Sequence, residues 1–408
     1  AKPDEALVTG TMTIDVAVSE DSAIQVEYTK DSQSKTVYYT GLDNDDRNND
    51  HYWDVISDLS SGYLNADTNE PITVTLLDDI TLADTTILVD AGKKVTINGN
   101  GHTITATMSS FAEAGKPGAD AVSITNDSTL TLNNVKLNIK AADAVVLNGE
   151  TSTQGIYNDG ILTLTGGTQV TINGVSKNGI NGSGDITISG ENTKIEVTDV
   201  GGSAIKCDDL KADEGATITI SNTPYHGITG KNVTIQNATV SVDDADYIGI
   251  AATGDVSVTG EGTNVTVQNS GSNGSGYPAV RVDGGFTMTD RANLTMTGNG
   301  PTESGADFNA VRLNAVEATA TVEGASLNGG IDGTTISDRT GNITNGGSAS
   351  TVLLNSQINK APEGAIVIGC TDTTGEKIED SVSEGVVAVY NGPPYTSLKQ
   401  AVEAATGD

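Results

Sequence analysis

Four aromatic side chains recur at one position of a repeating pattern, and carbohydrate recognition is the chemistry that such a series could perform. Tyr225, Tyr247, Tyr277 and Phe308 each lie two residues before a Gly or Ala that is followed by Ile or Val. Aromatic residues make up only 4% of the chain, so chance explains this regularity poorly. Equivalent positions of a repeat stack on one another, and sugar rings pack on aromatic faces with polar groups nearby. We therefore expect an aromatic column.

Two arginines follow the last two aromatic residues at a fixed distance, each two residues after the start of its repeat unit. Side chains alternate along a strand, and the Val or Leu residues on either side of each arginine belong to the core pattern. We therefore expect an outward aromatic column, a trough of Gly and Ala beside it, and the arginines beyond. The hypothetical ligand-binding residues are Tyr225, Tyr247, Tyr277, Arg281, Asp283, Phe308 and Arg312. If the chain bends before the strand, the rings instead stack inside and only stiffen a turn.

An acidic run between residues 43 and 50 is a candidate calcium site. Asp43, Asp45 and Asp50 offer hard oxygen ligands close together, although the run lacks the Gly and terminal Glu of an EF-hand loop. A solvated acidic loop that caps a following helix is the alternative. No other cofactor is expected, because His51, His102 and His226 are not spaced as a metal pair and no phosphate-binding loop precedes a helix.

The two cysteines share the inward parity of core positions. Cys207 follows Ile205 and Cys370 follows Ile368, each by two residues. About six coil rises separate them, or roughly 29 Å at the strand spacing, whereas a disulfide needs Cα atoms within about 7 Å. We expect two free, buried thiols.

The overall composition excludes several classes of protein. The 408 residues carry 21 Lys and Arg against 54 Asp and Glu, for a formal charge of −33. Nucleic-acid binding needs basic patches, and an anionic membrane surface repels such a chain. No apolar run approaches the ~20 residues of a membrane span. An acidic, Gly-rich, aromatic-poor chain is typical of an extracellular surface protein.

Short alternating strands repeat along most of the chain. Units open at Gly155, Gly179, Ala204, Gly227, Gly249, Ala279 and Ala310, at spacings of 22 to 31 residues. Three short strands per unit of this length predict a parallel β-helix, whose coils stack about 4.8 Å apart. The last two units are longer by the segments 270–278 and 298–308, which we expect to protrude side by side.

Helical periodicity is confined to two short segments. The spacing predicts a helix over 52–64, where it would cap the solenoid, and another over 397–405. We therefore divide the chain into an N-terminal β segment with the acidic loop (1–50), the β-helix with its capping helix (51–385), and a C-terminal strand and helix that could begin a further domain (386–408).

The stretch Pro71–Thr105, PITVTLLDDITL followed by KKVTINGNGHTIT, resembles the opening coils of pectate-lyase-like right-handed parallel β-helix proteins of bacterial surfaces. The resemblance implies an all-β fold and a protein secreted to the cell surface or cell wall of a bacterium. That family contains polysaccharide lyases, glycoside hydrolases and non-catalytic adhesins. The hydrolase motifs are missing here, and the basic residue and calcium cluster of the lyases are not found.

We therefore expect no enzyme but a carbohydrate-binding adhesin, whose partner is an extracellular glycan or a host surface ligand. A lyase or hydrolase of the same fold and a passive surface stalk are the alternatives.

Overall fold

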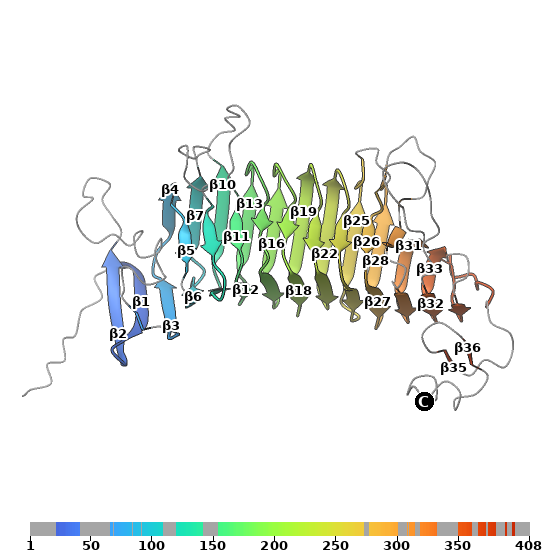
Figure 1. Ribbon diagram of the computed structural model, residues 1–408, viewed down its shortest axis with the longest axis horizontal. Helices are drawn as coiled ribbons and strands as arrows, with labels where there is room; N and C mark the ends of the chain where they lie inside the picture. The colour runs from blue at the N-terminus through green and yellow to red at the C-terminus, as the bar shows by residue number, and fades with distance from the viewer. Residues whose placement is uncertain are drawn as a thin grey trace, which may run out of the picture.

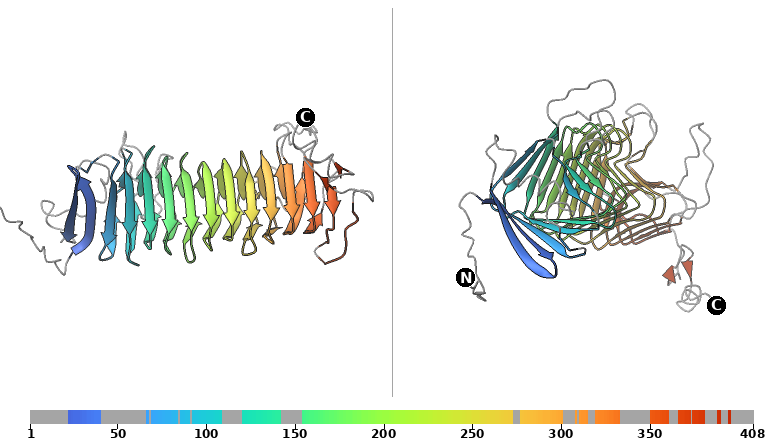
Figure 2. Two further views of the ribbon diagram at one scale, coloured as in Figure 1. Left: turned by 90° about the horizontal axis from the view of Figure 1, so that it is seen from below. Right: turned by 60° about the vertical axis from the view of Figure 1, so that its left-hand side comes forward.

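The computed structural model describes residues 22–40, 66–67, 69–83, 85–90, 92–108, 120–141, 154–272, 277–300, 308, 310–314, 319–332, 350–360, 366–372, 374–380, 388–389 and 394–395. Every regular element in these residues is a β-strand. The strands follow one another in coils along the long axis of the molecule, as Figures 1 and 2 show. The protein is a parallel β-helix, as its repeat predicts.

Each complete coil contributes three strands. The first strand of each coil belongs to a fourteen-stranded sheet, and the second and third belong to a twenty-stranded sheet. The first strands are β3 (Pro71–Leu76), β6 (Lys94–Asn98), β9 (Thr129–Asn133), β12 (Ile161–Thr165), β15 (Asp185–Ser189), β18 (Asp209–Asp213), β21 (Asn232–Gln236), β24 (Val256–Thr259), β27 (Gly285–Thr289), β30 (Thr319–Glu323), β32 (Ser350–Leu354) and β34 (Ile366–Ile368).

The second strands are β4 (Ile80–Ala83), β7 (Thr103–Met108), β10 (Lys136–Ala141), β13 (Gln169–Asn173), β16 (Lys194–Thr198), β19 (Thr217–Thr223), β22 (Thr239–Ala245), β25 (Asn264–Gln268), β28 (Asn293–Thr297), β31 (Ser326–Asp332) and β33 (Gln357–Lys360). The third strands are β5 (Ile87–Val89), β8 (Val122–Ile124), β11 (Ile156–Asn158), β14 (Ile180–Asn181), β17 (Ile205–Lys206), β20 (Ile228–Gly230), β23 (Ile250–Ala252), β26 (Val280–Val282) and β29 (Ala310–Leu313).

The repeat units of the sequence are the coils of the structure. From β11 to β29, the Ile or Val that follows each unit opening lies in the third strand and pairs in parallel with its counterpart in the next coil. The aligned residues are Ile156, Ile180, Ile205, Ile228, Ile250, Val280 and Val311. Both long segments, 270–278 and 298–308, connect second to third strands, and residues 273–276 and 301–307 within them lie outside the described ones.

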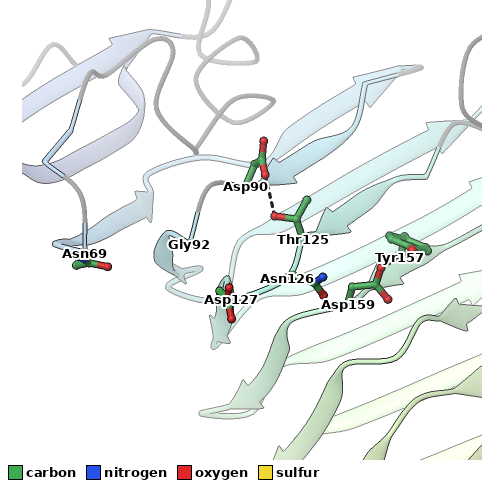
Figure 3. A pocket seen from close by; sticks show the side chains of 8 residues that line it. All are labelled: Asn69, Asp90, Gly92, Thr125, Asn126, Asp127, Tyr157 and Asp159. Atoms are coloured by element: carbon green, nitrogen blue, oxygen red, sulfur yellow. Dashed lines mark hydrogen bonds between the residues drawn. The ribbon is translucent and has the colours of Figure 1, made fainter.

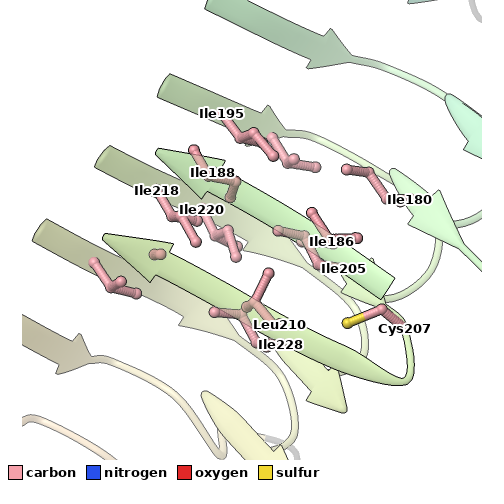
Figure 4. Packing of buried hydrophobic residues seen from close by; sticks show 14 of the residues in the cluster. Ile180, Ile186, Ile188, Ile195, Ile205, Cys207, Leu210, Ile218, Ile220 and Ile228 are labelled. Atoms are coloured by element: carbon pink, nitrogen blue, oxygen red, sulfur yellow. The ribbon is translucent and has the colours of Figure 1, made fainter. Parts of the chain in front are cut away.

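The core is a stack of branched aliphatic side chains. In β15 the inward residues Ile186 and Ile188 are fully buried while Thr187 between them is partly exposed, and the same alternation runs through nearly every coil. Figure 4 shows how Ile195 of the second strand and Ile205 of the third strand close the same layer. Stacked coils thus bury one continuous core, which no single coil could form.

The first turn of the coil imposes a left-handed backbone. The residue directly after ten first strands has a positive φ, a conformation in which Gly, Asn and Asp are the least strained residues. These residues are Asn134 (53°), Gly166 (64°), Gly190 (100°), Glu214 (53°), Asn237 (49°), Gly260 (97°), Asp290 (58°), Gly324 (58°), Asn355 (46°) and Gly369 (66°). Gly or Asn fills eight of these ten positions, as this turn favours.

An antiparallel hairpin covers the N-terminal edge of the fourteen-stranded sheet. Its strands are β1 (Ser22–Lys30) and β2 (Gln33–Thr40), and β1 pairs antiparallel with β3. The hairpin turn is held by Asp67, whose carboxylate accepts the N–H groups of Asp31 at 3.0 Å and Ser32 at 2.8 Å. An open solenoid end is an unpaired sheet edge, and β1 pairs with that edge at β3, which leaves β2 as the outer strand of this sheet.

Several expected features lie outside the described residues. They are the capping helix over 52–64, the acidic loop with Asp43, Asp45 and Asp50, and the helix over 397–405. Near the C-terminus the described residues include a short antiparallel pair, β35 (Ala388–Val389) with β36 (Pro394–Tyr395).

Both cysteines are free and buried, as their parity predicts. Burial, followed by the negative charge of Asp185, Asp208 and Asp209, raises the pKa of the Cys207 thiol to about 12. Burial also raises the pKa of Cys370. Each thiol therefore acts as a small apolar core residue.

The core alternation predicts a sharp contrast between neighbouring substitutions. Ile188→Ala should lower the free energy of unfolding by about 2–5 kcal/mol, because it leaves a cavity between coils. The matched control Thr187→Ala, on the outward side of the same strand, should cost less than about 1 kcal/mol. Urea denaturation followed by circular dichroism measures both, and equal losses would contradict the stated burial.

The thiols give a second test of the coil register. Native protein at pH 8 should react with none of its cysteines when a soluble aromatic disulfide reagent is added, because both thiols are shielded and protonated. The same protein in urea should release two equivalents of chromophore. A fast-reacting thiol in the native protein, or a Cys207–Cys370 bridge found by mass spectrometry, would contradict this assignment.

Candidate functional site

Three of the four predicted aromatic residues form a column at the corner between second and third strands. The rings of Tyr225 and Tyr247 are stacked, with centroids 5.4 Å apart and planes at 12°. The rings of Tyr247 and Tyr277 are 4.9 Å apart at 38°. These separations are close to the coil rise of about 4.8 Å. Tyr225 is 50% exposed, and the other two rings are partly exposed.

The fourth aromatic residue was wrongly predicted to continue this column outward. Phe308 is 7% exposed and packs against the backbone of Gly300, where a Cβ atom would lie only 2.0 Å from the ring. The φ of Gly300 is +88°, so a glycine both permits this turn and leaves room for the phenyl group. Phe308 has no hydroxyl to keep in water, so it fills this space.

The predicted trough of Gly and Ala beside the column is also wrong. Ala279 is fully buried, and a Cβ atom on Gly227 would lie 2.5 Å from Cγ1 of Val242 in the core. A Cβ atom on Gly249 would lie 2.2 Å from Val267. The chain turns inward at each unit opening, so strand alternation does not continue back through the corner.

Only one of the two arginines is presented outward. Arg281 and Arg312 are aligned in neighbouring coils as predicted, but Arg312 is 7% exposed. Arg281 forms a bidentate ion pair with Asp283, with Nε–Oδ1 and Nη2–Oδ2 distances of 3.1 Å. Asn314 donates a further hydrogen bond to Asp283 at 3.0 Å. This pair fixes the guanidinium and offsets its charge.

His226 supports the column from the side. Its Nδ1 accepts the N–H of Ile248 at 3.2 Å, and its ring meets the edge of Tyr247 at 5.5 Å and 68°. Burial, and then the charge of Arg281, lower the pKa of His226. The imidazole is therefore neutral at neutral pH, with Nε2–H as its donor.

A hollow of about 490 Å³ lies where the column ends. In the coil before that of Tyr225, the equivalent position is occupied by Gly202, two residues before the unit opening at Ala204. One coil earlier, the position is occupied by Lys177. The hollow is lined by these residues together with Gly201, Lys206, Tyr225 and His226. The spacing that defines the aromatic column thus places Gly202 next to Tyr225, where the column ends, and the sequence alone carries this signal.

A second, acidic hollow of about 630 Å³ lies nearer the N-terminus, and Figure 3 shows its walls. The hydroxyl of Thr125 donates to Asp90 at 2.8 Å. Asp159 accepts hydrogen bonds from the hydroxyl of Tyr157 and from the N–H and hydroxyl of Ser183. Burial acts to raise the pKa of Asp159, but these hydrogen bonds outweigh it and lower the pKa. Asp159 is thus an ionised, fully engaged acceptor.

One acidic group among the described residues has the spacing of a metal site. The carboxylate oxygens of Asp185, Asp208 and Asp209 lie within 4.8 Å of one another. Hydrogen bonds between coils already engage two of them, since Asp185 accepts the N–H of Asp209 and Asp209 accepts the side-chain amide of Asn232. The calcium candidates Asp43, Asp45 and Asp50 lie outside the described residues.

Comparison of the chain with protein-family models, curated proteins and solved structures finds no match. The described residues include no helix that could cross a bilayer.

The lowered pKa of His226 makes stability depend on pH. Below the ordinary pKa of about 6.5 the unfolded chain binds a proton at this residue more readily than the folded protein does, so the contribution of His226 to stability falls as the pH falls from about 7 to about 5. His226→Gln keeps an acceptor for Ile248 and removes the titration. Its melting temperature should drop less than that of the wild type over this range. Identical drops would exclude a buried neutral imidazole.

Proposed function

We propose that the protein is a non-catalytic, surface-displayed glycan-binding protein of the adhesin type, and that it binds sugar at the free face of Tyr225. The observation that carries the proposal is the end of the aromatic column at Tyr225. One face of the Tyr225 ring stacks on Tyr247, while the ring also lines the hollow above Gly201 and Gly202. Its half-exposed ring is the most open of the three.

The stacking geometry decides which ring can bind. At 12° between planes, Tyr225 and Tyr247 cover each other's faces, so a sugar cannot lie flat on each ring in turn along the column. Tyr247 also has Tyr277 on its other side. One sugar per coil is therefore replaced by stacking at an end of the column, and Tyr225 is the more exposed of the two end rings.

The hollow has the chemistry of a sugar site. Its volume of about 490 Å³ falls within the ~300–1,000 Å³ typical of small-ligand sites. An aromatic face accepts the C–H face of a pyranose, while the hydroxyl of Thr229 and the donor of His226 lie on the same walls. The base of the hollow contains Gly202, where only a glycine fits, because a Cβ atom there would lie 2.3 Å from Oδ1 of Asn178. The missing side chain leaves the space beside Tyr225 open.

Surface display rests on composition and on the resemblance of the opening coils. A charge of −33 keeps a long solenoid soluble and repels nucleic acid and anionic membranes. The proposed partner is an extracellular glycan or host surface ligand, and the proposed location is the cell surface or wall of a bacterium.

The alternative function is a polysaccharide lyase or glycoside hydrolase, and the acidic hollow favours it. Asp90, Asp127 and Asp159 line that hollow. Nearby, burial raises the pKa of Asp120 to about 6, against the hydrogen bond from Gln154. Hydrolysis needs one protonated and one ionised carboxyl on opposite sides of a glycosidic bond. If the protein is an enzyme, the double variant Asp120→Asn with Asp127→Asn should abolish glycan cleavage. The binding proposal expects the wild type to cleave no glycan.

A glycan array with the purified full-length chain tests the proposal. We expect binding to at least one glycan class and a loss of about ten- to a hundredfold in affinity for Tyr225→Ala, the effect of removing one well-buried aromatic contact. Tyr157→Ala is the matched control, since Tyr157 is also partly exposed but lies at the acidic hollow. The melting temperatures of both variants should stay near that of the wild type.

A reducing-sugar assay on the same glycans runs in parallel. If the wild type releases products and the double aspartate variant does not, the adhesin proposal is wrong and the protein is an enzyme. If the protein neither binds nor cleaves any glycan of the array, both proposals are wrong and the remaining alternative is a passive surface stalk.

A further inference from the structure

The charge around the Tyr225 hollow is opposite to that of the whole chain. The protein has a formal charge of −33, yet the charged side chains that line this hollow are Lys177 and Lys206, without any Asp or Glu among the lining residues. The two lysines come from different coils, before β14 and within β17. An ammonium is a compact, strongly hydrated cation that suits a carboxylate or sulfate.

Other surface lysines of this region are already engaged. Lys231 lies 3.8 Å from Asp208, Lys211 lies 2.6 Å from Asp213, and Lys194 lies 3.7 Å from Glu196. Among the described residues, no carboxylate lies within ion-pair distance of Lys177 or Lys206. What sets these two lysines apart is that they face one hollow that no carboxylate lines, although Lys177 still acts at longer range on Asp120.

The hollow also has one unsatisfied hydroxyl. Oγ1 of Thr229 is shielded from water and has no hydrogen-bond partner. The floor, in contrast, is satisfied, because Oδ1 of Asn178 accepts the N–H of Ser203 at 2.8 Å and Nδ2 of Asn178 donates to Asn181 at 2.9 Å. A shielded polar atom without a partner costs stability, so it calls for an explanation such as an absent ligand. Rotation about Cα–Cβ would present the Thr229 hydroxyl to a ligand in the hollow.

We infer that this hollow is a subsite for an acidic sugar. The pyranose ring stacks on the free face of Tyr225, its carboxylate or sulfate is bound by Lys177 and Lys206, and a ring hydroxyl pairs with Thr229. The inference rests on the proposed glycan-binding function and adds the charge of the ligand to it. Uronic and sialic acids carry a carboxylate and sulfated sugars carry a sulfate, and both are anionic groups that the lysines would bind.

Arg281 is not part of this subsite. Its guanidinium is held by Asp283, four coils beyond Lys177. The specificity for charge therefore depends on the two lysines, and the affinity for a sugar ring depends on Tyr225. These two dependences can be separated by mutation.

Equilibrium binding to the full chain tests the inference with matched sugars. The probes are a uronic-acid oligosaccharide, a sialylated one and a sulfated one, each beside its neutral counterpart. We expect at least one acidic probe to bind about ten- to a hundredfold more tightly than its neutral counterpart, as charge-assisted hydrogen bonds predict. Lys177→Gln with Lys206→Gln should remove this preference and keep the neutral affinity. Tyr225→Ala should weaken both.

The control is Lys231→Gln, which removes one surface charge that is already paired with Asp208. It should leave the preference intact. The preference should also fall with added salt in the wild type but not in the double lysine variant, because exposed charges are screened. The probe that shows the preference identifies which acidic group the site takes.

The outcomes separate the inference from the function on which it rests. Equal binding of acidic and neutral probes, with loss only in Tyr225→Ala, overturns the acidic subsite and keeps glycan binding. A preference that survives the double lysine variant also overturns the subsite. Absence of binding to every probe overturns both proposals.

Discussion

Parallel pairing between successive coils, in unbroken register through the middle of the helix, is the constraint from which the other features follow. Each strand between β9 and β28 satisfies its backbone hydrogen bonds only against the coils before and after it. Equivalent positions are therefore stacked at about 4.8 Å whatever residues occupy them. An aliphatic position becomes a core column, a turn position becomes a column of left-handed residues, and a tyrosine position becomes a stack of rings. The N-terminal hairpin follows from the same constraint, since the first coil has no predecessor.

Stacking also decides how the protein distributes its negative charge. A column of aspartates at this spacing would repel itself, and the start of the first strand shows how the chain avoids that. Asp209 donates its N–H to the Asp185 carboxylate, and Asn232 donates its side-chain amide to the Asp209 carboxylate at 2.8 Å. Asp255 donates its N–H to the side-chain oxygen Oδ1 of Asn232 at 2.9 Å. Asparagine and backbone N–H groups thus alternate with carboxylates along the column. In this column Asp185 and Asp209 stack in register although both are acidic, because each accepts a hydrogen bond from a neighbouring coil.

The sequence predicted the coil but not its corners. The Ile or Val directly after each unit opening marked the third strands correctly, because alternation of branched and polar residues reflects burial within a strand. The same alternation failed between Tyr277 and Ala279, because the chain turns inward there and the parity is lost. Phe308 does not join the column, because its ring packs against Gly300, whose positive φ and missing side chain make room for it. No pattern in the sequence around Phe308 indicates this packing. The aromatic column itself was predictable for Tyr225, Tyr247 and Tyr277, since repeat register alone positions it.

A perfect repeat leaves little room for a binding site, because identical side chains cover one another. The faces of Tyr247 are occupied by the rings on either side, and only an interruption exposes a ring face. Gly202 is such an interruption, and it exists because the backbone of its coil passes so close to Asn178 that no side chain fits. The hollow is therefore one coil wide and bounded by a ring on one side and by Lys177 on the other. If the proposed site is correct, recognition in this solenoid belongs to the position where the aromatic repeat ends, and the rings of Tyr247 and Tyr277 behind Tyr225 would hold that ring in place.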